Sequence, residues 1–258
     1  MKILVIMKQT FDTEAQIVLK DGKIEAEGVK QILNPYDEYA VEEAVQLKEK
    51  NGGEVIAVGI GDAAFEGTLR HVLAMGCDRA VVLDDPALQA ADARGQAAAL
   101  AAAIRPLEAD LLLCGYTMID CGDGEVNIRL AALLGMGEVM AVSQLTLEGS
   151  TITAVSEQEG GRLVVAGELP LLIGVDKGIN EPRYPGMKNI MQGRKKAKAA
   201  LHLSAEKLGL SPESLQPVCQ VKEVFLPAKR SAGTILTGEA GPAARKLAAL
   251  LHGEAKVV

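Results

Sequence analysis

Apolar and polar positions in the first half of the chain alternate between two patterns. Short, unbroken apolar runs, typical of strands buried on both faces, occupy residues 2–7, 54–59, 80–83 and 111–114. Between these runs, apolar residues recur at helical spacing near residues 40–47, 65–75, 89–104 and 128–134. Four repeats of strand and helix predict an α/β fold in which helices cover both faces of a parallel sheet.

The pattern changes in the second half of the chain. Alternating apolar and polar residues joined by glycine-containing turns predict an antiparallel meander over residues 139–168, and residues 169–175 return to a buried strand. Residues 201–258 contain prolines and short elements, with a last helix over residues 243–251. We therefore expect residues 1–200 to form one α/β domain, and the remainder to form an arm that packs on another subunit.

Polar motifs follow the first strand. Lys8 comes directly after it, at the carboxyl end, where open α/β sheets bind ligands. Residues 18–30 should form a small hairpin. Asn34 and Pro35, followed by two acids, predict the start of a helix with Asn34 as its N-cap. Asn34 and Tyr36 should then lie at the rim where the first strand ends.

The segment after residues 111–114 combines features of an anion site. Its loop reads Asp120-Cys121-Gly122-Asp123-Gly124. The following helix should bury Ile128, Ala131, Ala132 and Leu134. Glycines let backbone N–H groups approach a phosphate, and the first helical turn adds unpaired donors and a positive dipole end. Acids in the loop oppose an anion, so the loop alone favours a plain connection between strand and helix.

A second glycine turn, residues 59–64, fits the G-x-G-x-x-A form of the dinucleotide fingerprint. In a nicotinamide enzyme this motif belongs to the first βα turn, whereas here it follows the second strand. The position favours a tight turn or a different nucleotide pose, and an NAD-dependent dehydrogenase is the weaker alternative. Such an enzyme needs an acid–base histidine at its cleft, yet His71, His202 and His252 are expected away from the strand ends.

Composition narrows the function classes. A net charge of −7 argues against nucleic acid as the main partner, because that binding depends on neutralising phosphates. No apolar run approaches the ~20 residues of a membrane span, and the N-terminal segment is too soon polar for a signal peptide, so we expect a cytoplasmic protein. The four cysteines lack metal-site spacing. With 3% aromatic residues and no tryptophan, any redox chemistry would need a bound cofactor.

Residues 182–205 carry six positive charges and no acid, in a chain that is acidic overall. A solvated surface is the usual meaning of such a charge run. Here two prolines, a glycine and the apolar Met187, Ile190 and Met191 stand beside the charges. This mixture predicts an exposed protein-docking loop.

Taken in order, these segments resemble the β subunit of electron transfer flavoproteins over nearly the whole chain. The matching segments read KILVIMKQ, NPYDEYAVEEAVQLKEK, EVIAVGIG, LAMGCDRA, DLLLCG, NEPRYPGMKNIM and, over residues 230–236, R-x-A-G-x-I-L. NPYDEYAVEEA and NEPRYPGMKNIM are long and specific. The resemblance implies a parallel-sheet nucleotide-binding domain of the adenine nucleotide alpha hydrolase-like kind, in an electron carrier with no catalysis of its own.

The resemblance also implies cofactors and partners. An α subunit would hold the redox-active FAD in a heterodimer, while this chain would hold an adenine nucleotide, AMP in most relatives and a second FAD in electron-bifurcating ones. A flavin dehydrogenase such as an acyl-CoA dehydrogenase would dock to pass electrons. The implied nucleotide contacts are Ile6, Lys8, Asn34, Pro35, Tyr36, Asp37, Ile60, Thr117, Met118, Ile119, Asp120, Cys121, Gly122, Asp123, Gly124, Glu125, Val126, Asn127 and Ile128.

Two motif details bear on these roles. The family loop usually continues into T-G-Q or V-G-P near the helix start, whereas this chain has Val126-Asn127, which leaves AMP and FAD open and leans toward FAD. The family's recognition loop matches residues 180–196, with Met187 in place of an anchoring leucine. The implied docking residues are Arg183, Met187, Lys188, Ile190, Met191, Arg194, Lys195 and Lys196. The main alternative is a stand-alone adenine-nucleotide-binding regulatory protein of the same fold, which would have no use for the arm.

Overall fold

The computed structural model describes residues 1–228 and 233–257, which form two compact units. The first unit contains Met1–Val18 and Glu25–Lys222. The second contains Leu19–Ile24 and the described residues from Glu223 onward. The arm therefore separates after Lys222 and not after residue 200, which corrects the boundary expected from the sequence.

A sheet with nine described strands forms the centre of the first unit, in the order β11-β10-β9-β12-β8-β1-β6-β7-β13. Its parallel strands are β1 (Lys2–Met7), β6 (Glu54–Ile60), β7 (Arg79–Leu83), β8 (Leu111–Gly115), β12 (Leu171–Val175) and β13 (Leu201–Leu203). The meander consists of β9 (Gly137–Glu148), β10 (Thr151–Gln158) and β11 (Gly161–Glu168). Because β9 pairs in parallel with β12, the meander extends the same sheet. The predicted α/β fold is confirmed.

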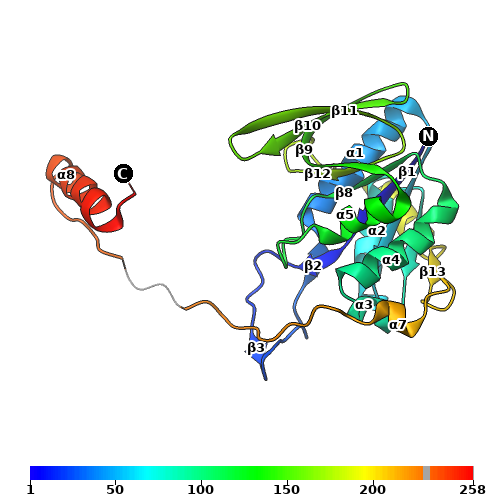
Figure 1. The fold of residues 1–258 in the computed structure, drawn as a ribbon, viewed down its shortest axis with the longest axis horizontal. Coiled ribbons are helices and arrows are strands. Elements are labelled where there is room, and N and C mark those ends of the chain that lie inside the picture. Colours follow the sequence, from blue (N-terminus) through cyan, green and yellow to red (C-terminus); the bar gives the residue numbers. More distant parts are fainter. Residues whose placement is uncertain (229–232, 258) are drawn as a thin grey trace. The chain divides into compact units, whose positions relative to one another are not determined.

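Helices cover both faces of this sheet (Figure 1). One face carries α1 (Pro35–Asn51), α2 (Glu66–Met75) and α6 (Met187–Ala197). The other carries α3 (Pro86–Ala90), α4 (Ala93–Ile104), α5 (Glu125–Leu134) and α7 (Pro212–Leu215). Alternate residues of β1 serve the two cores, since Ile3 and Val5 belong to the first and Leu4 and Ile6 to the second. Single 3₁₀ turns occur at Ala63–Phe65 and Arg105–Leu107.

Two small sheets lie outside the central one. The expected hairpin forms as β3 (Leu19–Lys20) and β4 (Lys23–Ile24). The pairing of β2 (Gln9–Phe11) with β5 (Gln31–Leu33) was not expected. This antiparallel pairing holds the segment after β1 against the segment before α1, outside the central sheet.

Two helix predictions need correction. The expected helix over residues 89–104 is interrupted, because the Asp92 carboxylate accepts the Gly95 N–H at 3.1 Å and starts α4 as a new helix. In α5 the buried face is formed by Asn127, Leu130 and Ala131, while Ile128 is 48% exposed and Ala132 is exposed. Ala131 and Leu134 of the predicted face do face the core, but the apolar pattern missed Asn127, a polar residue that points inward.

Residues 201–222, expected in the arm, pack with the first unit. β13 pairs with β7 in the register Leu201↔Val81. Leu215 of α7 is buried in the core beside α4. In the second unit α8 (Ala240–Leu250) continues into a π-helical turn, Leu251–Ala255, which confirms the predicted last helix. The first three residues of the 230–236 motif lie outside the described residues.

Among the residues that the structure describes, no helix combines the length and the apolar character needed to cross a bilayer.

Candidate functional site

The order of the strands creates a crevice at one edge of the central sheet. From β1 the chain builds β6 and β7 on one side, whereas β8 lies on the other side of β1. Ligands of open α/β sheets bind at such a switch point, outside the carboxyl ends of the strands. A cleft of about 340 Å³ lies there, at the ends of β1, β6 and β8.

The cleft brings together about half of the residues expected around a nucleotide. Those that line it are Ile6, Lys8, Ile60, Met118, Cys121, Asp123, Gly124, Val126 and Asn127. The expected contacts that do not line it are Asn34, Pro35, Tyr36, Asp37, Thr117, Ile119, Asp120, Gly122, Glu125 and Ile128. Lining residues that the sequence reasoning missed are Met7, Gln9, Gln31, Gly61, Asp62, Gln89, Ala93, Gln96 and Leu100. Gln9 and Asp62 could have been found, since each closely follows a strand.

Asp37 joins the start of α1 to the carboxyl ends of β1 and β8. Its side chain is fully buried in the first turn of α1. The two carboxylate oxygens accept the backbone N–H groups of Lys8 and Gly115, each at 2.8 Å. Burial raises the pKa of Asp37 to about 7, although these N–H groups and Asn34 pull it down. The side chain therefore fixes the ends of β1 and β8, instead of touching a ligand.

The side chain of Asn34 does not cap α1, although the sequence predicts that it would. Asn34 stands at the N-cap of α1, but its side chain makes no capping hydrogen bond. Its amide donates to the Thr117 carbonyl at 3.1 Å, and its oxygen accepts the Ile119 N–H at 3.3 Å. The start of α1 thus holds the loop that follows β8. Beside it, the rings of Tyr36 and Tyr116 meet edge to face with centroids 4.9 Å apart.

Asn127 carries an acceptor that no described residue satisfies. The side chain is fully buried, lines the cleft, and donates to the Gly115 carbonyl at 3.0 Å. Its Oδ1 has no hydrogen-bond partner. A buried acceptor without a donor is costly, so such groups usually face a ligand or a water. The amide oxygen fits a ligand that offers a hydroxyl or an amino group, as a nucleotide does.

The cleft combines groups that attract a phosphate with acids that oppose it. Gly124 is the N-cap of α5 and offers no side chain, so the positive end of the helix dipole faces the cleft. A Cβ at this position would lie 2.4 Å from the Tyr116 carbonyl oxygen, which is why glycine is required. Lys8 adds a cation, although its Nζ lies 2.7 Å from Asp120. Asp62 and Asp123 also line the cleft and limit the net charge that it tolerates.

The glycine turn after β6 has a packing explanation. A Cβ at Gly59 would lie 2.6 Å from the ring of Phe65, and one at Gly61 would lie 2.4 Å from it. Both glycines therefore make room for a buried aromatic ring, as expected of a tight turn. His71 pairs with Glu38, and neither it nor His202 lines the cleft.

His202 was expected away from the strand ends. It lies within the short strand β13 instead, and its Nδ1 is 3.3 Å from a carboxylate oxygen of Asp84, the residue after β7. The described residues contain no group of three potential metal ligands. All four cysteines are free.

Comparison with known proteins identifies the family of the chain. The sequence model of the electron transfer flavoprotein domain matches residues 21–206. The electron transfer flavoprotein subunit beta of Bacillus subtilis (strain 168) is 42% identical over 259 residues, covering 100% of both chains. The chain belongs to the electron transfer flavoprotein β-subunit family. The mouse electron transfer flavoprotein subunit beta is 36% identical over 239 residues, covering 90% of this chain and 91% of that one. The CarD subunit of the caffeyl-CoA reductase–Etf complex of Acetobacterium woodii is 36% identical over 244 residues, covering 92% of each.

The segment that matches the family's recognition loop, residues 180–196, is called the docking segment below. It is not a loop throughout, because α6 begins at Met187 with Gly186 as its N-cap. Gly193 packs against α2, where a Cβ would lie 2.7 Å from the Arg70 carbonyl oxygen. The opposite side is open, with Tyr184 99%, Met187 76% and Met191 69% exposed. Ile190 is half-buried between these two sides.

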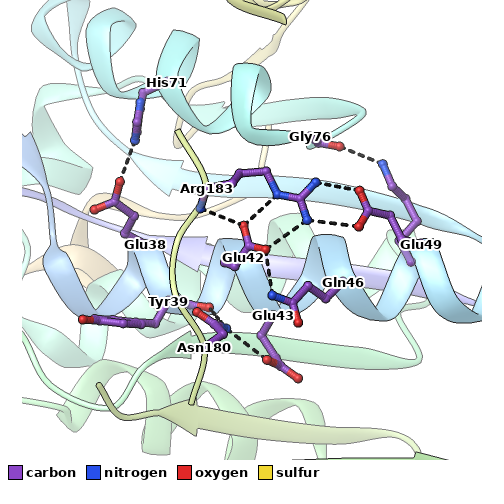
Figure 2. A network of polar contacts seen from close by, with 11 residues as sticks. Glu38, Tyr39, Glu42, Glu43, Gln46, Glu49, His71, Gly76, Asn180 and Arg183 are labelled. Carbon is purple, nitrogen blue, oxygen red and sulfur yellow. Dashed lines mark hydrogen bonds and ion pairs between the residues drawn. The ribbon is translucent and has the colours of Figure 1, made fainter. Parts of the chain in front are cut away.

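The cations of the docking segment fall into two groups. Lys188, Arg194 and Lys195 are exposed and form no ion pair within the described part of the chain. Lys196 is half-buried and donates to the Cys77 carbonyl at 2.8 Å. The Arg183 guanidinium is held between Glu42 and Glu49 of α1 (Figure 2). Two of the expected docking charges are thus used within the chain.

Proposed function

We propose that this chain holds an adenine nucleotide in the cleft between β1 and β8 and docks an electron-donating dehydrogenase through the docking segment. Membership of the electron transfer flavoprotein β-subunit family supports the overall role. In that role the chain positions cofactors and partners, and electrons pass through flavin bound in the complex with the α subunit. It performs no catalysis of its own.

The unsatisfied Oδ1 of Asn127 carries the nucleotide assignment. It is a buried acceptor in a cleft that also presents a helix N-terminus and one lysine. AMP or FAD would suit both features of the cleft. Each offers a hydroxyl or amino donor for the Asn127 oxygen and a phosphate for the helix N-terminus and Lys8. The phosphate would approach the first turn of α5, and Lys8 would balance part of its charge.

Filling the cleft tests this assignment. Ala93 lines the cleft at the start of α4, so Ala93→Phe should exclude the ligand, whereas Ala132→Phe on the exposed side of α5 is the matched control. Each variant is purified with the α subunit and denatured, and the released AMP and FAD are counted per heterodimer. Ala93→Phe should lose one nucleotide that the control keeps. Equal nucleotide content in both would refute the assignment. Gly124 is unsuitable as a target, because any side chain there meets the Tyr116 carbonyl.

The same measurement separates the two nucleotides. One AMP and one FAD per heterodimer would make this chain an AMP carrier, and two FAD without AMP would give it a second flavin. The match to CarD, a subunit of a caffeyl-CoA reductase–Etf complex, and Val126 at the cleft motivate the second possibility. Two flavins per heterodimer would make electron bifurcation the next property to measure.

We further propose that residues 223–257 cover the α subunit. Within the second unit Phe225 is exposed, as are Leu226, Ile235 and Leu247, and no core within the described residues receives them. The chain alone should therefore melt at a lower temperature than the heterodimer. An unchanged melting temperature on adding the α subunit, for a monodisperse monomer, would contradict the proposal.

The docking role has its own basis. Tyr184, Met187 and Met191 expose apolar surface beside Lys188, Arg194 and Lys195, which form no ion pair with any residue that the structure describes. A flexible thioether suits an apolar pocket, and the cations suit acids around it. An acyl-CoA dehydrogenase is the proposed partner class, and steady-state electron transfer at varied carrier concentration measures the interaction.

A further inference from the structure

The docking segment is tied to α1 before α6 begins. After β12 the chain passes across α1, and Arg183 points back onto that helix (Figure 2). Glu42 and Glu49 stand two helical turns apart on α1 and therefore face the same side. The guanidinium fits between their carboxylates.

All three nitrogens of the Arg183 guanidinium donate hydrogen bonds. Nε and Nη2 donate to Glu42 at 2.8 and 2.9 Å, and Nη1 and Nη2 donate to Glu49 at 2.6 and 3.0 Å. The backbone N–H of Arg183 also donates to Glu42 at 3.2 Å. Two-pronged pairing of this kind fixes orientation as well as position, and a lysine cannot reproduce it.

The receiving carboxylates differ in exposure. The Glu42 side chain is 3% exposed and also accepts from Gln46 at 2.8 Å, so it is held in place. The Glu49 side chain is 55% exposed and can be altered without opening a buried site. Glu42 is thus the fixed part of the contact and Glu49 the accessible part.

Asn180 forms a second tie to the same helix. Its amide donates to the Tyr39 carbonyl at 3.1 Å and to Glu43 at 3.0 Å (Figure 2). The chain is therefore fixed at two points immediately before the exposed Tyr184 and Met187. Without these ties, residues 181–186 would reach α6 with no regular secondary structure to hold them.

We propose that Arg183 is a positioning residue that locks the docking segment onto α1, and that it contributes no charge to the partner. The proposal rests on the docking role of this segment. One cation between two carboxylates leaves a net negative charge, so an acidic partner residue gains nothing by approaching Arg183. The lock instead presents Tyr184 and Met187 in one orientation, which reduces the ordering cost of binding.

Glu49→Gln and the double variant Glu42→Gln/Glu49→Gln distinguish a lock from a docking charge. Glu49→Gln neutralises one of the two carboxylates that hold Arg183 and the double variant neutralises both, and each change makes the surface more positive. If Arg183 met the partner directly, association would speed up or stay the same; if it is a lock, association slows. Arg183→Lys keeps the positive charge but loses the two-pronged pairing with Glu42 and Glu49. Lys195→Met is the control, because it removes an exposed cation from the same segment and leaves the Arg183 contacts intact.

Each variant is purified in complex with the α subunit, and two quantities are measured. Hydrogen exchange of peptides covering residues 180–192 should speed up by about tenfold in both glutamine variants and in Arg183→Lys, with α4 peptides and Lys195→Met unchanged. Association with a purified acyl-CoA dehydrogenase should slow by about threefold or more in the same variants, with saturating turnover unchanged.

Exchange in residues 180–192 equal to that of the wild type, or association at least as fast in the glutamine variants, would overturn the lock. If the dehydrogenase fails to bind even the wild type, the proposed docking role fails, and the exchange measurement still decides whether Arg183 orders the segment.

Discussion

The cleft and the docking segment both hold irregular chain in a defined shape, but they do so with different interactions. At the cleft, Asp37, Asn34 and Asn127 bind backbone groups from buried positions. At the docking segment, Arg183 binds side-chain carboxylates, one of them exposed. Buried bonds to the backbone are insensitive to salt, whereas exposed ion pairs are weakened by it. The proposed nucleotide site is thus held by buried bonds to the backbone, and the proposed docking surface by ion pairs that salt can weaken.

The largest effect is expected from breaking the cleft at Asp37. Asp37→Ala leaves the N–H groups of Lys8 and Gly115 without acceptors, at about 1–3 kcal/mol each. We expect the free energy of unfolding to fall by about 4 kcal/mol, and nucleotide to be lost. Urea unfolding of the chain in its heterodimer measures the change. Glu38→Ala, at the neighbouring position, is the control and should cost less than about 1 kcal/mol, since its contact with His71 is half-exposed.

The contributions of the two regions to the free energy of unfolding should depend on pH in opposite directions. The pKa of Asp37 is raised from 3.8 to about 7, so its contribution to stability is fully present below pH 3.8 and is lost as pH rises through about 7. Burial raises the pKa of Glu42, but hydrogen bonds from Arg183 and Gln46 outweigh burial and lower it; hydrogen bonds from Arg183 also lower the pKa of Glu49. The lock is therefore fully present above about pH 4.5 and weakens as pH falls below it.

Free energies of unfolding at pH 4 to 8 check these signs. The difference between wild type and Asp37→Asn should narrow as pH rises. The difference between wild type and Arg183→Met should stay constant over most of that range and narrow only at its acid end. Parallel pH profiles for the two differences would mean that the regions are not distinguished by ionisation.

The hydrophobic pattern was sufficient for most of the sheet, but not for β13 and not for the polar contacts that shape the site. Runs of apolar residues identified the strands, and the position of Lys8 after β1 followed directly. Asp37 was read as a first-turn acid, because no local pattern says that the ends of β1 and β8 offer it two N–H groups. Asn127 was found through the family match, and Arg183 through the run of positive charges and that match. The partners of Arg183, two glutamates of α1, lie more than 130 residues away in the sequence, so no local pattern could indicate them.

A smaller effect is expected from removing the anchor of the docking segment. Met187→Ala deletes an exposed thioether that we place in a partner's pocket, so the apparent KM for the carrier should rise roughly tenfold, or about 1.4 kcal/mol. Nucleotide and flavin content should not change, because the cleft is held separately. Leu133→Ala is the control, because Leu133 is also an exposed apolar residue but lies on α5, outside the docking segment. A KM equal to that of the wild type would remove Met187 from the docking surface.

The smallest effect concerns two neighbouring lysines that the structure uses differently. Lys195 is exposed without an ion pair among the described residues, so Lys195→Met should slow association at low salt by about twofold, and the difference should vanish at high salt.

Lys196 donates to the Cys77 carbonyl, so Lys196→Met should instead lower the free energy of unfolding by about 1 kcal/mol and leave the salt dependence of association nearly unchanged. Association rates against salt, with urea unfolding of each variant, separate the two outcomes. If both lysines changed the salt dependence equally, the hydrogen bond of Lys196 to Cys77 would not withhold its charge from the partner, and both lysines would belong to the docking surface.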